Sequence, residues 1–169
     1  LPDRDGWQKL GVNTYESLGE CDGSKATDFS LLYEDLHNLG VIFDVQDRAE
    51  VVITDLRTRV EAAQQRLAAA GATAGVVLTH DGTKDHPGAY GSTANAVIHL
   101  AGGTYPFIDV PLDRAPSWEE FVAADPDLIW IIPDAGSSAA AVEQQLATDP
   151  RTKDLKAVRD ERYVVVPQA

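Results

Sequence analysis

The stretch between residues 75 and 79 reads Gly75-Val76-Val77-Leu78-Thr79, a short and almost continuous apolar run. Such a run is typical of a strand that is buried on both faces of a parallel sheet. Two later stretches, residues 128–132 and 163–166, have the same character. Because helical patterns separate these three strands, the sequence predicts an α/β fold with a mostly parallel sheet flanked by helices.

A long amphipathic helix is predicted immediately before the first strand. It begins between Asp44 and Asp47, where an Asp side chain can cap the first turn, and it ends at Ala70 before Gly71. About 24 residues at 1.5 Å each give about 36 Å, which is long enough to connect two bodies. Its apolar stripe is predicted to pack against the lobe that follows it, through residues such as Val52, Leu56, Val60 and Leu67. The opposite side is charged and carries Arg48, Glu50, Asp55, Arg57, Arg59 and Glu61.

Shorter helices are predicted on both sides of this one. Leucines recur at helical spacing from residue 28 or 30 until Gly40 interrupts them. Ser117 and Glu120 have the spacing of a capping box, which starts a helix that ends before residues 125–126. Near the N-terminus, residues 10–12 predict a helix stop followed by a short strand.

Composition excludes several classes of function. The chain has 169 residues, 14 Lys and Arg, and 27 Asp and Glu, so its formal charge is −13. Such an acidic surface repels phosphate, so we expect no nucleic-acid partner. No apolar run approaches the roughly 20 residues of a membrane span. The chain starts at Leu1 and contains no Met, from which we expect a mature form or a fragment.

Common catalytic motifs are not present in the sequence. It has no glycine-rich nucleotide loop, no H-E-x-x-H and no G-x-S-x-G. Cys21 is the single cysteine, and its acidic, Gly-containing surroundings argue against a reactive thiolate. A surface thiol, or half of a disulfide to another chain, accounts for it better, so we expect a protein that is not an enzyme.

The loop after the first strand contains two His and two Asp residues between His80 and His86. This set could bind a divalent metal, but the spacing is not a standard one and Lys84 interrupts it, so a polar surface loop fits better. Its position is more informative. Ligands of open α/β sheets bind outside the carboxyl ends of the strands, and the loops at 80–91 and 133–137 both leave such ends. We therefore predict a binding site, without a protein-bound metal, that is lined by His80, Lys84, His86, Tyr90, Arg114 and Asp134.

The order of several short motifs resembles a known family. Asp47-Arg48-Ala49-Glu50 opens the long helix, and Tyr90-Gly91-Ser92, Leu100-Ala101-Gly102-Gly103 and Asp125-Pro126-Asp127-Leu128-Ile129 follow at suitable intervals. This arrangement is similar to that of bacterial solute-binding proteins of ABC importers for iron-siderophore complexes, haem and vitamin B12. The resemblance covers nearly the whole chain from Asp28 onward.

The resemblance implies two α/β lobes that are joined by one long helix, with the ligand in the cleft between them. Residues 1–27 would be a remnant of the N-terminal lobe and a loop, residues 28–70 the connecting helices and residues 71–169 the C-terminal lobe. Most of the N-terminal lobe would then be missing, and the surfaces that face it could form a homodimer of the fragment.

The same resemblance implies how the protein works. It would hold a ferric siderophore or haem, need no further cofactor, and deliver its ligand to an ABC permease in the membrane. In the family a carboxylate at a Ser-x-Glu helix start meets basic residues of the permease, and here that residue is Glu119. The full-length form would be lipid-anchored and periplasmic, or on the extracellular face of the membrane.

Two other functions stay open at this stage. One is direct binding of zinc or manganese, as in a related importer class, with His80, His86 and an Asp as ligands. The other is a small α/β enzyme, which the absence of a nucleophile and base pair disfavours. The balance of Lys84 and Arg114 against the loop aspartates argues for a hydroxamate chelate, or for haem with a His or Tyr ligand, but leaves the ligand open.

Overall fold

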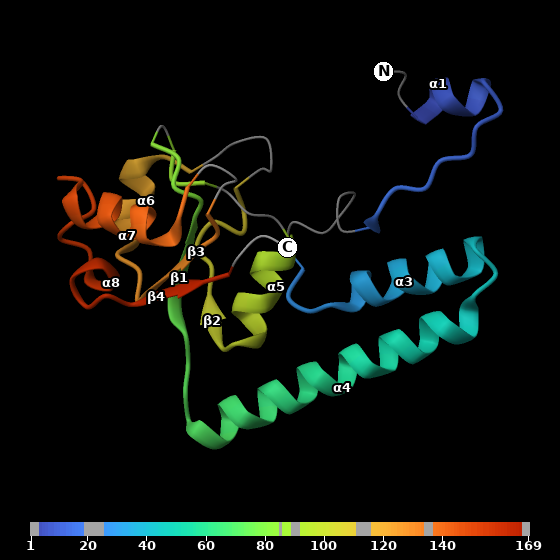
Figure 1. Ribbon diagram of the computed structural model, residues 1–169, viewed down its shortest axis with the longest axis horizontal. Coiled ribbons are helices and arrows are strands. Elements are labelled where there is room, and N and C mark those ends of the chain that lie inside the picture. The colour runs from blue at the N-terminus through green and yellow to red at the C-terminus, as the bar shows by residue number, and fades with distance from the viewer. Residues whose placement is uncertain are drawn as a thin grey trace.

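Four parallel strands form the centre of the C-terminal half, in the order β2-β1-β3-β4 (Figure 1). The computed structural model describes residues 4–18, 26–84, 86–88, 92–110, 116–133 and 137–166. The strands are β1 (Gly75–His80), β2 (Gly103–Thr104), β3 (Leu128–Ile131) and β4 (Tyr163–Val165). The predicted strands near 75, 128 and 163 and their parallel arrangement are therefore confirmed, whereas the two-residue β2 was not predicted.

Helices precede the sheet and cover it. They are α1 (Arg4–Lys9), α3 (Ser30–Ile42), α4 (Gln46–Ala70), α5 (Ser92–Leu100), α6 (Trp118–Ala124), α7 (Ala139–Thr148) and α8 (Lys156–Arg159). Figure 1 shows α3 and α4 side by side as a helical hairpin beside the lobe that holds the sheet. The capping box of α6 is confirmed, because Ser117 Oγ accepts from the Glu120 amide and Glu120 Oε2 accepts from the Ser117 amide.

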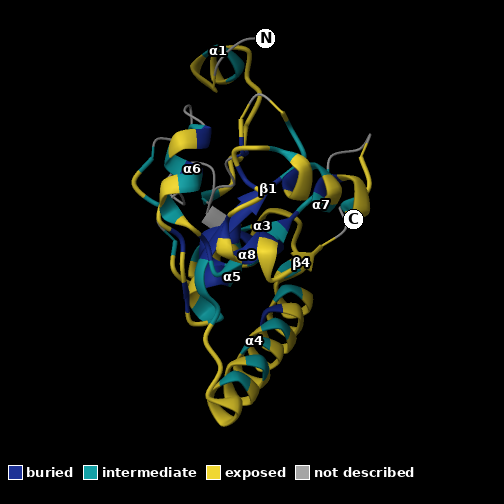
Figure 2. Cartoon of the chain, turned by 90° about the vertical axis from the view of Figure 1, so that its left-hand side faces the viewer, coloured by how far each residue is buried: buried dark blue, intermediate teal, exposed yellow. Residues whose placement is uncertain are grey.

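Alternate residues of the strands face opposite sides of the sheet. His80 packs beside Phe121 of α6 and belongs to the same side as Leu78. Val77 lies on the other side, where it lines an apolar groove with Ile98 of α5 and Trp130 of β3. The buried residues gather around the sheet, while most of α4 is exposed (Figure 2). The sheet and the helices on its two sides therefore contain most of the hydrophobic core.

Gly40 lies inside α3 and does not end it, contrary to the prediction. The helix continues to Ile42, and Gly40 is buried where α3 crosses the start of α4. A Cβ at Gly40 would lie 2.6 Å from the Cβ of Ala49, so the absence of a side chain allows the two helices to approach. This glycine is needed for close packing rather than for a change in chain direction.

The long helix α4 is continuous, as predicted, but its first turn and its buried side differ from the prediction. Val45 occupies the N-cap position without a side-chain cap hydrogen bond, so neither predicted Asp caps it; the C-terminal cap at Gly71 is left-handed. Ile53 is 2% exposed, whereas Val52 is 42% exposed and does not pack as predicted. The buried side of α4 differs from the prediction because α4 packs mainly on α3 and not on the sheet.

Large apolar side chains are exposed around the turn between α3 and α4. Phe43, in the turn itself, is 69% exposed. The others are Leu39, Val41, Ile42, Val45, Val51 and Val52. At the N-terminus, α1 is followed by Gly11 in a left-handed conformation, and residues 12–17 form no strand in the described part of the chain, so the short strand predicted there is not found.

Candidate functional site

The ends of β1 and β3 lie at one edge of the sheet. His80, the last residue of β1, pairs with Ile131, the last residue of β3. Because the strands are parallel, the segments that start at Asp81 and Ile132 leave from the same edge. The prediction that both loops begin at one edge is therefore confirmed, and ligands of α/β sheets bind at such an edge.

This edge faces the segment that precedes α3. Asn95, in the first turns of α5, is buried and donates a hydrogen bond from Nδ2 to the carbonyl oxygen of Ala26 at 2.5 Å. Thr93 and Ala96 of α5 line a small hollow of about 80 Å³ together with Ser17 and Asp35 from the N-terminal part. The N-terminal half of α5 is therefore in contact with the part of the chain that comes before the long helix.

Asp35 organises the N-terminal side of this contact. Its carboxylate is buried in α3 and accepts hydrogen bonds from Tyr15 Oη at 2.6 Å, Ser17 Oγ at 2.7 Å and the Leu18 amide at 3.0 Å. Hydrogen bonds of this kind to a carboxylate are stronger than neutral ones. The carboxylate therefore fixes the segment 15–18 against α3.

His80 is fully buried at the end of β1. Its Nδ1 lies 2.8 Å from the carbonyl oxygen of Pro87, and a carbonyl only accepts, so Nδ1 carries the proton in the neutral ring. Its Nε2 is buried and has no hydrogen-bond partner in the part of the chain that the structure describes. Desolvation by burial lowers the pKa of His80 below its ordinary value. The side chain therefore holds the far end of the loop instead of facing solvent.

The loop from Asp81 to Gly88 is held by further contacts. Its first turn is closed by Asp81 Oδ1, which accepts from the Thr83 amide at 2.8 Å. Gly82 has a φ of 90°, and a Cβ there would lie 2.8 Å from Val142 of α7. Near its end, the Gly88 amide donates to Nδ1 of the exposed His86 at 3.1 Å.

Lys84 lies in the middle of this loop and is exposed. Its carbonyl oxygen accepts a hydrogen bond from Trp118 Nε1 of α6 at 2.9 Å. Lys84 also lines a hollow of about 510 Å³ beside the end of α7. The other lining residues are Gln145, Thr148, Asp149, Pro150 and Arg151. Arg151 pairs with Asp149 at 2.6 Å and lowers the pKa of that carboxyl group.

Three of the six predicted ligand residues are described and three are not. His80, Lys84 and His86 belong to one loop, which the structure ties to α6 and α7. Tyr90, Arg114 and Asp134 lie outside the described residues, as does Cys21. Glu119 is exposed in the first turn of α6. The pKa of Arg151 is raised mainly because Arg151 donates hydrogen bonds to Asp149, and the charge of Glu119 adds to this effect.

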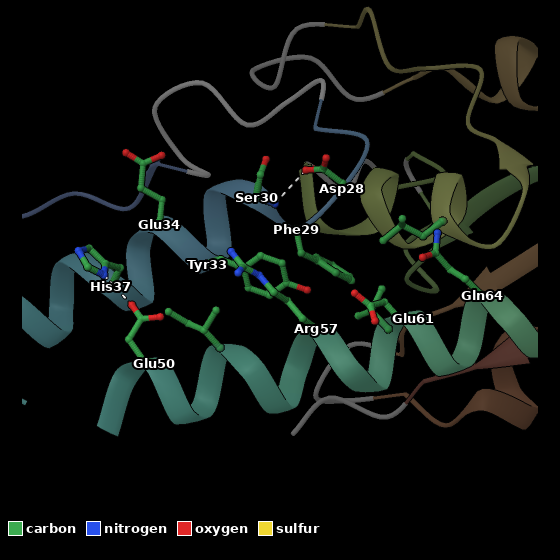
Figure 3. Close-up of a pocket in the computed structure, with 13 residues that line it drawn as sticks. Asp28, Phe29, Ser30, Tyr33, Glu34, His37, Glu50, Arg57, Glu61 and Gln64 are labelled. Atoms are coloured by element: carbon green, nitrogen blue, oxygen red, sulfur yellow. Dashed lines mark hydrogen bonds and ion pairs between the residues drawn. The ribbon is translucent and has the colours of Figure 1, made fainter. Parts of the chain in front are cut away.

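A second hollow, of about 440 Å³, lies between α3 and α4 (Figure 3). His37 Nδ1 and Glu50 Oε1 are 2.8 Å apart at one end, and the Arg57 guanidinium lies 4.9 Å from the centre of the Tyr33 ring. Burial raises the pKa of Tyr33. The sequence does not predict this hollow, because three of its α4 residues, Glu50, Arg57 and Glu61, belong to the side opposite the apolar stripe. The available signal is Tyr33 and His37, one turn apart on α3.

The described residues contain neither a metal-ion cluster nor a membrane-spanning helix. No group of three or more His, Cys, Asp or Glu side chains there is placed to hold a metal ion. None of the helices in the described part of the chain combines the length and apolar content that crossing a lipid bilayer requires.

Comparison with known proteins decides the family. A family model described as "Periplasmic binding protein" matches residues 8–169. The chain belongs to the periplasmic binding protein family. The family and two of the solved structures below are described as binding proteins. No curated protein sequence matches the chain.

This family member is similar to several solved structures. A protein of an ABC-type Fe3+-hydroxamate transport system from Saccharomonospora viridis is 27% identical, with a TM-score of 0.78, and the match covers 98% of this chain and 58% of that one. A periplasmic binding protein from Veillonella parvula is 25% identical, with a TM-score of 0.79 and coverage of 96% and 57%. A periplasmic heme binding protein from Pseudomonas aeruginosa, at 23% identity and a TM-score of 0.68 over 95% and 57%, shares the fold. The chain thus spans less than two thirds of the length of these proteins.

Proposed function

We propose that this periplasmic binding protein holds a ferric chelate, a siderophore complex or haem, for an ABC importer. The observation that carries the proposal is the match to the Fe3+-hydroxamate transport protein over 98% of this chain, together with the family. The importer's permease would be its partner, and the protein would act on the periplasmic or extracellular side of the membrane. In this proposal residues 28–70 connect two parts and residues 71–169 form the C-terminal lobe.

The ligand would lie between the carboxyl edge of the sheet and the segment before α3. Support comes from the loop at 81–88, which starts at this edge, and from Asn95, which brings the N-terminal part to the same place. Lys84, His86, Tyr90, Arg114 and Asp134 remain our candidates for ligand contact. His80 would support the loop and not touch the ligand, because it is buried and bonds to the carbonyl oxygen of Pro87. Glu119 remains our candidate for docking on the permease.

The charge of the loop bears on the class of chelate. Lys84 lies between Asp81 and Asp85, and the whole chain carries a charge of −13. A catecholate complex with three negative charges needs several cations around it, because like charges repel in a partly desolvated cleft. These residues therefore favour a hydroxamate complex, or haem.

Equilibrium dialysis tests this proposal. We expect saturable binding of ferric ferrioxamine B or of haem, measured by the absorbance of the bound iron chelate, and much weaker binding of ferric enterobactin. The iron-free chelators serve as matched controls. If no iron chelate binds and dialysed protein retains zinc or manganese in elemental analysis, the proposal is wrong and direct metal binding replaces it.

A further inference from the structure

The middle of the loop at 81–88 is held by one side chain of α6. The near end of the loop packs on Val142 through Gly82, and the far end is bonded by His80 at Pro87. Between these two points, within the described residues, the hydrogen bond that ties the loop to a helix is the one from Trp118 Nε1 to the Lys84 carbonyl oxygen, at 2.9 Å. The position of Lys84 therefore depends on where the indole lies.

The indole itself is held by groups around it. Trp118 is 6% exposed, and its ring lies 5.4 Å from the His80 ring and 5.6 Å from the Phe121 ring, both in edge-to-face geometry. The Arg151 guanidinium lies 4.5 Å from the ring centre. Edge-to-face and cation–π contacts orient an aromatic ring as well as bury it. The donor is thus oriented by groups of the protein itself.

These contacts connect the end of β1, the loop at 81–88 and the start of α6. His80 contacts both the loop, through Pro87, and the indole that bonds Lys84. Trp118 is also the first residue of α6, next to the exposed Glu119. A displacement of the first turn of α6 therefore moves the donor of the Lys84 hydrogen bond.

We propose that the Trp118 indole N–H is a positioning group that fixes the ligand-binding conformation of the loop at 81–88. Its effect on ligand affinity rests on the proposed function of that loop, whereas its effect on loop order does not. The indole touches no ligand in this proposal and acts through the backbone of Lys84.

Two replacements of Trp118 remove the donor. Trp118→Phe removes the N–H and one ring, and replacement of Trp118 by benzothienyl-alanine removes the N–H while keeping the two-ring shape. Trp130→Phe is the matched control, because the buried Trp130 Nε1 has no hydrogen-bond partner among the described residues, so its loss breaks no described bond. If Trp118→Phe unfolds the lobe, the benzothienyl-alanine variant still tests the effect of the missing N–H on the loop at 81–88.

The first measurement is hydrogen exchange of the amides at 82–88. In both Trp118 variants we expect exchange about 5- to 10-fold faster than in the wild type, which corresponds to about 1–1.4 kcal/mol. The amides of β3 serve as an internal reference for global unfolding and should keep their rates in the Trp118 variants. In Trp130→Phe the loop should exchange no faster relative to β3 than it does in the wild type. Unchanged exchange in the loop, or equal acceleration in β3 with the shape-preserving replacement, would overturn the proposal.

The second measurement is the dissociation constant of ferric ferrioxamine B by equilibrium dialysis. We expect it to rise by a similar factor in the Trp118 variants and to stay constant in Trp130→Phe. Faster loop exchange with unchanged affinity would overturn the link to the ligand. If the wild type binds no iron chelate, the proposed function fails, and the exchange rates alone decide whether Trp118 fixes the loop.

Discussion

At the scale of the residue, the imidazole of His80 predicts a pH dependence of stability. Burial lowers its pKa below the ordinary 6.5, so the unfolded chain binds more protons at this site than the folded one. The contribution of neutral His80 to the free energy of unfolding is present above about pH 6.5 and decreases as the pH falls toward the pKa of the folded state. Asp127 and Asp149 have lowered pKa values, so their contributions are lost only below about pH 4. The free energy of unfolding should fall between about pH 7.5 and about pH 5, and we expect this fall to be smaller in His80→Asn. The Asn amide can still donate to Pro87. Urea unfolding at the two pH values measures the difference. The same substitution at the exposed His99 is the control, and an unchanged pH dependence in His80→Asn would contradict the prediction.

At the scale of the element, Ile53 predicts how firmly α4 is held to its neighbour. Its side chain is 2% exposed, and truncation of a buried Ile leaves a cavity, so Ile53→Ala should lower the free energy of unfolding by about 2–5 kcal/mol. Val51 is 70% exposed on the same helix, and Ala is the better helix former, so Val51→Ala should be neutral or stabilising by about 0.5 kcal/mol. Urea unfolding midpoints followed by circular dichroism measure both. Equal effects of the two substitutions would show that α4 is not packed as the structure has it.

The same elements show what could be predicted from the sequence and what could not. The strands β1, β3 and β4 were found because each is a local apolar run, but β2 has two residues, Gly103 and Thr104, and gives no such run. From the sequence, Gly40 predicts a helix stop, because its role in packing depends on Ala49, which comes close only when α3 and α4 pack together. The carboxyl-edge rule located the loop after β1. It could not show that His80 lies beneath Trp118, since that depends on which side of the sheet α6 covers.

At the scale of the whole molecule, docking on a permease is tested by the charge of Glu119. This carboxylate is exposed in the first turn of α6, where the helix dipole stabilises it by about 0.3–1 kcal/mol without any partner. If Glu119 also meets basic residues of the permease, Glu119→Lys in the full-length protein should leave ligand affinity unchanged and reduce stimulation of the importer's ATPase. Asp154→Lys, an equal change of charge at another exposed residue, is the control. Equal ATPase stimulation by both variants and the wild type would remove Glu119 from the interface.

Because α4 is long, a small change of angle at its C-terminal end would displace its N-terminal end by several ångströms. Residues 71–74 join the helix to β1, and the joint begins at Gly71 in a left-handed conformation. Twenty-five residues give an arm of about 37 Å, so a tilt of about 5° at Gly71 moves the Gln46 end by about 3 Å. A change of angle too small to disturb the sheet therefore becomes a shift of several ångströms at the turn between α3 and α4. The distance between two spectroscopic labels, one at that turn and one in α8, would report any such change of angle.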